Sequence, residues 1–207
     1  MARVEAEWLE GADSVTQAAG VTARALRDSP SAVAISTDPL QRFDMLHRAF
    51  SAALAVARVA GIRQGRCVLG VAGAVPPGHC VGAALTPELR TLEVPDANAT
   101  DADRFLYSAS IMARHDPLEP HWHVGPVGVE PGFQSMGLGR AAMGLLCDEF
   151  DQYGRLAWLE TDKPGNVPFY RGLGFELMAE EVMLDARYWF MRRRPKEVGT
   201  RTSSPQD

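Results

Sequence analysis

Residues 121–153 constrain the fold of this chain more than any other segment. Residues 121–129 are apolar enough for a buried strand, and residues 137–153 carry apolar side chains at helical spacing. These side chains form one stripe along the helix, at positions 138, 141, 142, 145, 146 and 150. A glycine-rich turn joins the two elements. We therefore expect a strand that leads directly into the N-terminus of a long amphipathic helix.

The turn carries two glycines at the mouth of the helix, Gly137 and Gly139. Glycine lets backbone N–H groups approach a ligand closely. The first N–H groups of a helix have no partners within it, and the helix dipole favours negative charge there. Arg140 adds a positive charge that suits a phosphate better than it suits the dipole. The segment therefore predicts a pyrophosphate site at the start of the helix.

Two common phosphate-binding motifs do not fit this turn. A dinucleotide-binding GxGxxG would need a third glycine where Ala142 stands, and a P-loop would need Gly-Lys-Ser/Thr. A glycine pair before a helix can also be no more than a tight turn. What remains is Gln134-x-x-Gly137-x-Gly139, preceded by an apolar strand that ends in Val129-x-Pro131.

The segments after the long helix predict the rest of a sheet. Residues 156–161 read as a strand, Asn166 as the cap of a short helix, and Gly174 as a left-handed helix end. Residues 175–183 and 187–193 read as two further strands. The order strand–helix–strand–helix–strand–strand predicts an α/β fold with a mixed sheet and helices on both faces.

The first half of the chain has weaker patterns. We expect from it, in chain order, a strand at 3–9, a helix to about Arg27 capped by Asp13 or Ser14, a helix from Asp38-Pro39, an antiparallel strand pair at 67–72 and 79–85, and a helix at 101–114. The length of 207 residues predicts a single domain over residues 1–196. Residues 197–207 are polar, and we expect a disordered tail.

Composition excludes several classes of protein. A net charge of −5 argues against a general nucleic-acid binder, which carries a broad basic surface. No run of about 18 apolar residues predicts a membrane span, and the N-terminus lacks the apolar core of a secretory signal. The three cysteines lack CxxC spacing, so we expect a reducing, cytoplasmic setting. The apolar final strands could support a homodimer.

The combined motif resembles the acetyl-CoA signature of the GCN5-related N-acetyltransferases (GNAT). The pattern is Q-x-x-G-x-G after V-x-V-x-P, and the resemblance continues through Leu159-Glu-Thr, Asn166-Val-Pro-Phe-Tyr170 and Gly174-Phe175. It covers residues 122–194 well, and its C-terminal part is similar to puromycin N-acetyltransferase-like members. It implies the GNAT fold, whose central sheet is mostly antiparallel with helices on both faces.

The resemblance also implies acetyl-CoA as cofactor and assigns residues to it. The backbone of the strand end would pair with the pantetheine arm, and this end comprises Val127, Gly128 and Val129. Main-chain amides of the turn would hold the pyrophosphate, and they belong to Gln134, Ser135, Met136, Gly137, Leu138, Gly139 and Arg140. Many family members have glycine where this chain has Ser135. Asn166 would contact the coenzyme arm or only cap its helix.

The implied reaction is acetyl transfer to a primary amine of a small molecule, by direct attack in a ternary complex. A protein or peptide N-acetyltransferase and a catalytically silent acyl-CoA-binding module remain alternatives. By resemblance, Tyr170 is the candidate general acid that protonates the leaving thiolate. It could instead be a core aromatic residue of its helix.

The attacking amine must be neutral, so a carboxylate or histidine should accept its proton. Glu130 and Glu160 stand at the ends of the two flanking strands, and we prefer Glu160 because it precedes the Asn166 helix. Either glutamate could be only a solvated charge. His121 and His123 lie on one face of their strand. No third ligand has suitable spacing, so we expect no metal site.

Overall fold

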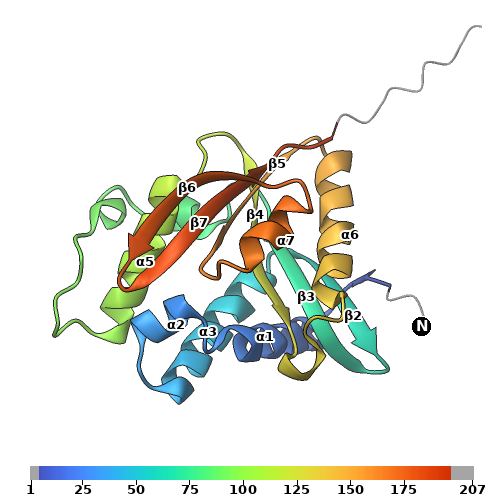
Figure 1. Cartoon of the computed structure of the whole chain (residues 1–207), viewed down its shortest axis with the longest axis horizontal. Coiled ribbons are helices and arrows are strands. Elements are labelled where there is room, and N and C mark those ends of the chain that lie inside the picture. The colour runs from blue at the N-terminus through green and yellow to red at the C-terminus, as the bar shows by residue number, and fades with distance from the viewer. Residues whose placement is uncertain (1–4, 197–207) are drawn as a thin grey trace, which may run out of the picture.

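The computed structural model of the chain describes residues 5–196 and contains one seven-stranded sheet (Figure 1). The strand order is β1-β2-β3-β4-β5-β7-β6. The strands are β1 (Glu7–Trp8), β2 (Arg58–Gln64), β3 (Cys67–Val75), β4 (His121–Val129), β5 (Leu156–Thr161), β6 (Glu176–Met183) and β7 (Ala186–Arg193). Neighbouring strands are antiparallel except β4 and β5, which are parallel. This sheet confirms the predicted mixed, mostly antiparallel architecture.

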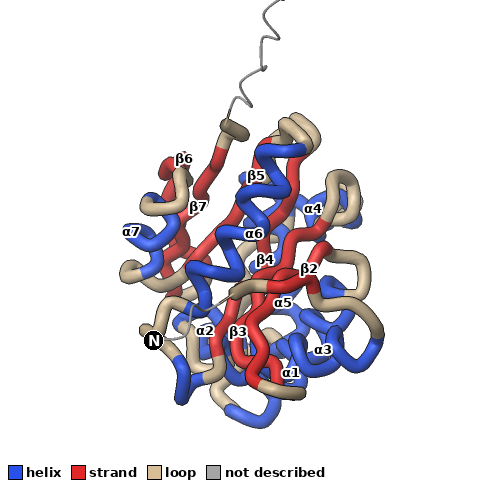
Figure 2. The backbone as a smooth tube through the Cα atoms, turned by 90° about the vertical axis from the view of Figure 1, so that its right-hand side faces the viewer, coloured by secondary structure: helices blue, strands red, loops and turns tan. Residues whose placement is uncertain are grey.

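Helices cover both faces of this sheet (Figure 2). They are α1 (Ala12–Leu26), α2 (Pro30–Ile35), α3 (Pro39–Leu54), α4 (Val81–Ala84), α5 (Asp101–His115), α6 (Leu138–Gln152) and α7 (Asn166–Arg171), with short 3-10 turns at Leu89–Thr91 and Pro131–Phe133. On one face, Met143 and Phe150 of α6 and Tyr170 of α7 share a core with Trp122 and Leu159 of the sheet. Separate cores on the other face contain side chains of α1, α2, α3 and α5.

The C-terminal half follows the sequence closely. Strands β4 and β5 have the predicted bounds, and α6 is one residue shorter than expected at each end. Gly174 adopts a φ of 89°, as its predicted left-handed position requires. The elements of the C-terminal half were predictable because α6 has a single apolar stripe. A helix with one apolar face packs against the sheet on that side.

Three predictions about element boundaries were wrong. Residues 79–85 form no strand, since Cys80 precedes the short helix α4; the partner of β3 is β2. Helix α1 begins at Ala12 after Gly11, so Asp13 lies inside its first turn rather than before it. Asn166 likewise lies inside α7, after Gly165 as the capping residue, and does not cap the helix.

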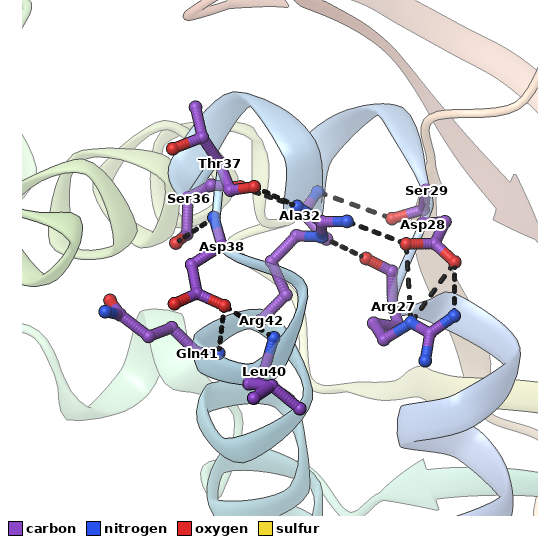
Figure 3. A network of polar contacts seen from close by, with 10 residues as sticks. All are labelled: Arg27, Asp28, Ser29, Ala32, Ser36, Thr37, Asp38, Leu40, Gln41 and Arg42. Atoms are coloured by element: carbon purple, nitrogen blue, oxygen red, sulfur yellow. Dashed lines mark hydrogen bonds and ion pairs between the residues drawn. The ribbon is translucent and has the colours of Figure 1, made fainter.

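A polar network joins α1, α2 and α3 (Figure 3). Helix α3 begins at Pro39, as expected, and the Asp38 carboxylate caps it by accepting from the Leu40 N–H at 2.8 Å. The buried Arg42 donates to the Arg27 carbonyl at 2.7 Å and to Asp28 at 2.7 Å. Hydrogen bonds from Arg27 and Arg42 lower the pKa of Asp28 to about 2. The network fixes α2, whose first turn contacts the candidate site.

Three further expectations concern the tail, a membrane span and a homodimer. The predicted tail at 197–207 lies outside the described residues. Within residues 5–196, no helix combines the length and the apolarity that crossing a membrane requires. On β7, Tyr188, Phe190 and Met191 are buried inside the chain, so these side chains no longer argue for a homodimer. A homodimer stays a prediction.

Candidate active site

Strands β4 and β5 separate after a short common stretch. Their pairing consists of His121 with Leu156, Trp122 with Ala157 and His123 with Trp158. Beyond this stretch β4 pairs only with β3, while β5 pairs with β7 up to Thr161. Figure 1 shows β4 running down from its label, while β6 and β7 lie to the left of it. Residues 124–129 therefore present a sheet edge that β5 does not cover.

The start of α6 follows directly after this edge. Gly137 has φ 83° and ψ −1°, a left-handed conformation, and is the N-cap residue. Ser135 also has a positive φ, 62°. The first hydrogen bond of the helix runs from the Ala141 N–H to the Gly137 carbonyl at 3.0 Å. The N–H groups of residues 138–140 therefore have no acceptor within the helix.

This helix start is open and electropositive. Residues 134–137 are exposed, and the first turn of α6 holds no acidic residue. A Cβ added at Gly137 would meet nothing within 4 Å. The positive end of the helix dipole thus faces free space, which suits an anion.

Two side chains of the predicted phosphate loop fold back onto the protein. The Gln134 amide donates to the Val129 carbonyl at 3.2 Å, which ties the loop to the end of β4. The Arg140 guanidinium donates to the Gly172 carbonyl at 3.3 Å and lies 5.9 Å from the centre of the Phe169 ring. The side chain of Arg140 thus joins α6 to α7, while its N–H stays at the start of the helix.

Tyr170 is both a core residue and a protonated phenol. It is 6 % exposed, and its ring lies edge-on to Phe169 and Phe175. Burial raises the pKa of Tyr170 well above its ordinary value, and the charges of Glu160 and Asp162 raise it further. The hydroxyl therefore keeps its proton at neutral pH and lies within electrostatic reach of both carboxylates.

Glu160 lies beside His123. The His123 Nε2 is 3.0 Å from a Glu160 carboxylate oxygen, because the pairing of His123 with Trp158 brings Glu160 alongside. Burial would lower the pKa of His123, but Glu160 and Asp116 outweigh it and raise that pKa well above the usual value. The other candidate, Glu130, is held in a two-pronged ion pair by Arg24 of α1. Both candidate bases are therefore paired, Glu160 with an imidazole and Glu130 with a guanidinium.

Sequence reasoning did not single out Asp162. Its carboxylate accepts from the Ser31 N–H at 2.8 Å and from the Ser31 hydroxyl at 2.5 Å, at the first turn of α2. The predicted coenzyme contact Asn166 donates to the Thr161 hydroxyl at 2.9 Å and so fixes α7 to the end of β5. The sequence signal that could have identified Asp162 as a candidate site residue is its position directly after the strand at 156–161.

The histidine pair of β4 has neighbours that sequence spacing did not reveal. Cys80 and Asp116 lie against both histidines, on the sheet face covered by α5. Neither residue was singled out, because 36 residues separate Cys80 from Asp116 and their meeting depends on the packing of α4 on α5. The expectation that the pair lacks further candidate ligands was therefore wrong.

Comparison with known proteins identifies a family model and similar structures. Residues 35–175 match the model of the Acetyltransferase (GNAT) family. A histone acetyltransferase HPA2 and related acetyltransferase from Corynebacterium glutamicum shares 16 % identity over 95 % of this chain and 99 % of its own, with a TM-score of 0.63. A mosquito arylalkylamine N-acetyltransferase like 5b shares 13 % identity over 92 % of this chain and 100 % of its own, with a TM-score of 0.66.

An agmatine N-acetyltransferase has a similar fold as well. It shares 13 % identity over 92 % of this chain and 99 % of its own, with a TM-score of 0.64. At these identities the structural similarities establish the fold, and the family model extends from α2 through α7.

Proposed function

This chain belongs to the GNAT acetyltransferase family, and from that premise we propose that it transfers an acetyl group from acetyl-CoA to a primary amine of a small molecule. One observation carries the proposal. The uncovered edge of β4 ends beside the exposed amides at the start of α6. A strand edge suits an amide-containing arm, and a helix start suits a diphosphate.

In this proposal the donor is held mainly by the main chain. Residues 127–129 pair with the pantetheine arm, and a free N–H of this strand polarises the thioester carbonyl. The amides of residues 134–140 bind the pyrophosphate. Ser135 supplies its N–H from the left-handed conformation that it already adopts. Asn166 contacts the coenzyme arm from the start of α7.

The proposed chemistry is direct transfer between the two bound substrates. The neutral amine attacks the thioester carbonyl, so that a carbon–nitrogen bond forms and the carbon–sulfur bond breaks. Glu160 accepts the proton that the amine loses, and Tyr170 donates a proton to the departing thiolate. The raised pKa of Tyr170 keeps the phenol protonated at neutral pH and also makes it a weaker acid, so the donor role rests on the family resemblance and on the place of Tyr170 in α7.

The charges near Tyr170 support a small cationic amine as acceptor. Glu160 and Asp162 both act on its hydroxyl, and two carboxylates attract an ammonium group before it loses its proton. Similar folds include an agmatine N-acetyltransferase and an arylalkylamine N-acetyltransferase like 5b, which are named for small amines. We therefore expect turnover with a panel of small amines and acetyl-CoA, measured as thiol release. Turnover with peptide amines alone would favour a protein acetyltransferase.

A charge placed at the start of α6 tests the diphosphate site. We expect Gly139→Glu to weaken acetyl-CoA binding at least 10-fold by calorimetry, because the new carboxylate repels the pyrophosphate. The fold should not suffer, since an acidic residue in the first turn is favourable to a helix by about 0.3–1 kcal/mol. A Cβ at Gly139 makes only ordinary contacts, the nearest at 3.5 Å.

Gly144→Glu is the matched control. It adds the same charge in the middle of the same helix, where a Cβ meets nothing within 4 Å. Equal acetyl-CoA affinity in the two variants would remove the assignment of the diphosphate site.

Removal of one hydroxyl tests the general acid. We expect Tyr170→Phe to lower the single-turnover rate about 100-fold or more while the affinity for acetyl-CoA stays within twofold, because only proton donation is lost. Tyr153→Phe, at an exposed tyrosine, is the control. An unchanged single-turnover rate in Tyr170→Phe would exclude the role.

A further inference from the structure

Four side chains with metal-binding chemistry meet at the start of β4. Cys80 precedes α4, Asp116 follows α5, and His121 and His123 point to the same face of β4. One sulfur, one carboxylate oxygen and two ring nitrogens from these residues all lie within 4.8 Å of one another. Segments far apart in the sequence thus bring four different donor groups to one point.

The spacing of these atoms is close to that of a tetrahedral site. Asp116 Oδ2 lies 3.4 Å from the Cys80 sulfur, and Asp116 Oδ1 lies 3.4 Å from the His123 Nδ1 and 4.0 Å from the His121 Nε2. Bond lengths of about 2.0–2.3 Å around a tetrahedral zinc ion separate neighbouring ligand atoms by roughly 3.3–3.8 Å. A small contraction of the cluster reaches that geometry.

Three of the cluster's polar atoms lack a hydrogen-bond partner within the described residues. They are Asp116 Oδ1, His121 Nε2 and His123 Nδ1, and each is fully buried. The side chains of Asp116 and His121 are each only 7 % exposed. Buried polar atoms are nearly always satisfied, so three orphans facing one point require an explanation. A single cation at that point would satisfy all of them.

The outer nitrogens of both histidines are already occupied. His121 Nδ1 lies 3.0 Å from the Glu119 carbonyl and donates to it, which leaves the Nε2 lone pair facing the cluster. His123 Nε2 lies 3.0 Å from Glu160, which leaves the Nδ1 lone pair facing the same way. A backbone carbonyl and a carboxylate are the usual outer partners of metal-binding histidines.

We propose that Cys80, Asp116, His121 and His123 bind one Zn²⁺ ion. A thiolate with two imidazoles and a carboxylate favours zinc over magnesium or calcium, which prefer oxygen ligands alone. When zinc binds, the thiol proton and any proton on the two ring nitrogens that face the metal leave to solvent. Since the protein fills all four positions, the site is structural rather than catalytic. It fastens α4 and the end of α5 to β4, whichever amine the enzyme accepts.

Cobalt substitution tests the site directly. We expect the metal-stripped protein to bind one equivalent of Co²⁺ with a thiolate charge-transfer band and the intense visible bands of tetrahedral cobalt, and one equivalent of Zn²⁺ to abolish both. Zinc should also raise the Tm of the stripped protein. A folded wild-type chain that binds no cobalt, or only six-coordinate cobalt with weak bands, would overturn the proposal.

Variants then assign the ligands. We expect Cys80→Ser to lose the charge-transfer band and the Tm shift, whereas Cys67→Ser, at an exposed cysteine, keeps both. His121→Cys retains a donor at its position, so its charge-transfer band should grow stronger. A charge-transfer band that survives in Cys80→Ser, or that Cys67→Ser removes, would place the metal elsewhere and refute this assignment.

Discussion

At the scale of single residues, two backbone conformations set the start of α6. Gly137 and Ser135 both have positive φ, yet only the first is a glycine. Glycine adopts this region freely, whereas other residues are strained there. The need for glycine at position 137 was predictable from its place before the apolar stripe. The family resemblance implies glycine at position 135, and the φ of 62° that Ser135 adopts lies in the region that favours glycine.

The same geometry makes opposite predictions for two glycines of one helix. We expect Gly137→Ala to lower the free energy of unfolding by about 1–2 kcal/mol, because alanine is strained in the left-handed region. Gly144→Ala should raise it by about 0.5–1 kcal/mol, because alanine is the better helix former and its Cβ meets nothing within 4 Å. Urea unfolding of both variants measures the difference. A stabilised Gly137→Ala would contradict the assigned conformation.

The candidate catalytic groups were only partly predictable. Tyr170 and Glu160 follow from the family resemblance and from strand ends, and the structure keeps them within electrostatic reach. The contact of Glu160 with His123 depends on the register of two parallel strands, which no local pattern encodes. The contact of Cys80 with Asp116 depends on the packing of α4 against α5, which no local pattern encodes either.

At the scale of elements, the hairpin of β2 and β3 shows why sequence reading failed in the first half. Residues 79–85 are as apolar as a strand and follow a glycine–proline link, so they resembled the partner of β3. The actual partner pairs Gln64 with Cys67 across a two-residue turn in which Gly65 has φ 59°. Gly65 was the local signal for that tight hairpin. The apolar pattern of residues 79–85 was therefore misleading, because the turn between β2 and β3 determines which strand pairs with β3.

The C-terminal end of α6 is fastened to β7 by one carboxylate. Both oxygens of Asp151 accept from Arg193, at 2.8 and 2.7 Å, and one also accepts from the Lys196 N–H. The Arg193 side chain is only 2 % exposed. We expect Asp151→Asn to lower the free energy of unfolding by about 3 kcal/mol at pH 7, because it removes one charge of a buried pair. Asp148→Asn, at an exposed position of the same helix, is the control.

The loss of stability in Asp151→Asn should depend on pH, and the pKa of Asp151 gives the direction. Burial would raise the pKa of Asp151, but the hydrogen bonds from Arg193 and Lys196 outweigh it and lower that pKa. A lowered folded-state pKa means that the ion pair stabilises fully above the unfolded-state value near 3.9, and progressively less as pH falls through the folded-state pKa. The difference between wild type and Asp151→Asn should therefore shrink below about pH 4. If the two proteins differ in free energy of unfolding by the same amount from pH 7 to pH 3, the pKa of Asp151 is not lowered by this ion pair.

At the scale of the whole molecule, donor binding should protect one continuous stretch of chain. Hydrogen exchange of residues 124–140 should slow when coenzyme A is added, because the ligand occupies the uncovered edge of β4 and the start of α6. Residues 58–75, which form the hairpin of β2 and β3, should change little. Mass spectrometry of peptic fragments measures both. Protection confined to the hairpin would place the coenzyme on another surface.

The short parallel contact between β4 and β5 has a consequence for how such a chain can diversify. The sheet is two antiparallel units, β1 to β4 and β5 to β7, which share a seam of three residue pairs. Each unit keeps its own antiparallel ladder, while α6 and α7 pack in one core with strands of both units. Substitutions at exposed positions of β6, such as Met178 and Val182, can therefore accumulate while the surface beside β4 and the start of α6 stays constant. One side of the opening between β4 and β5 can thus change while the other is preserved.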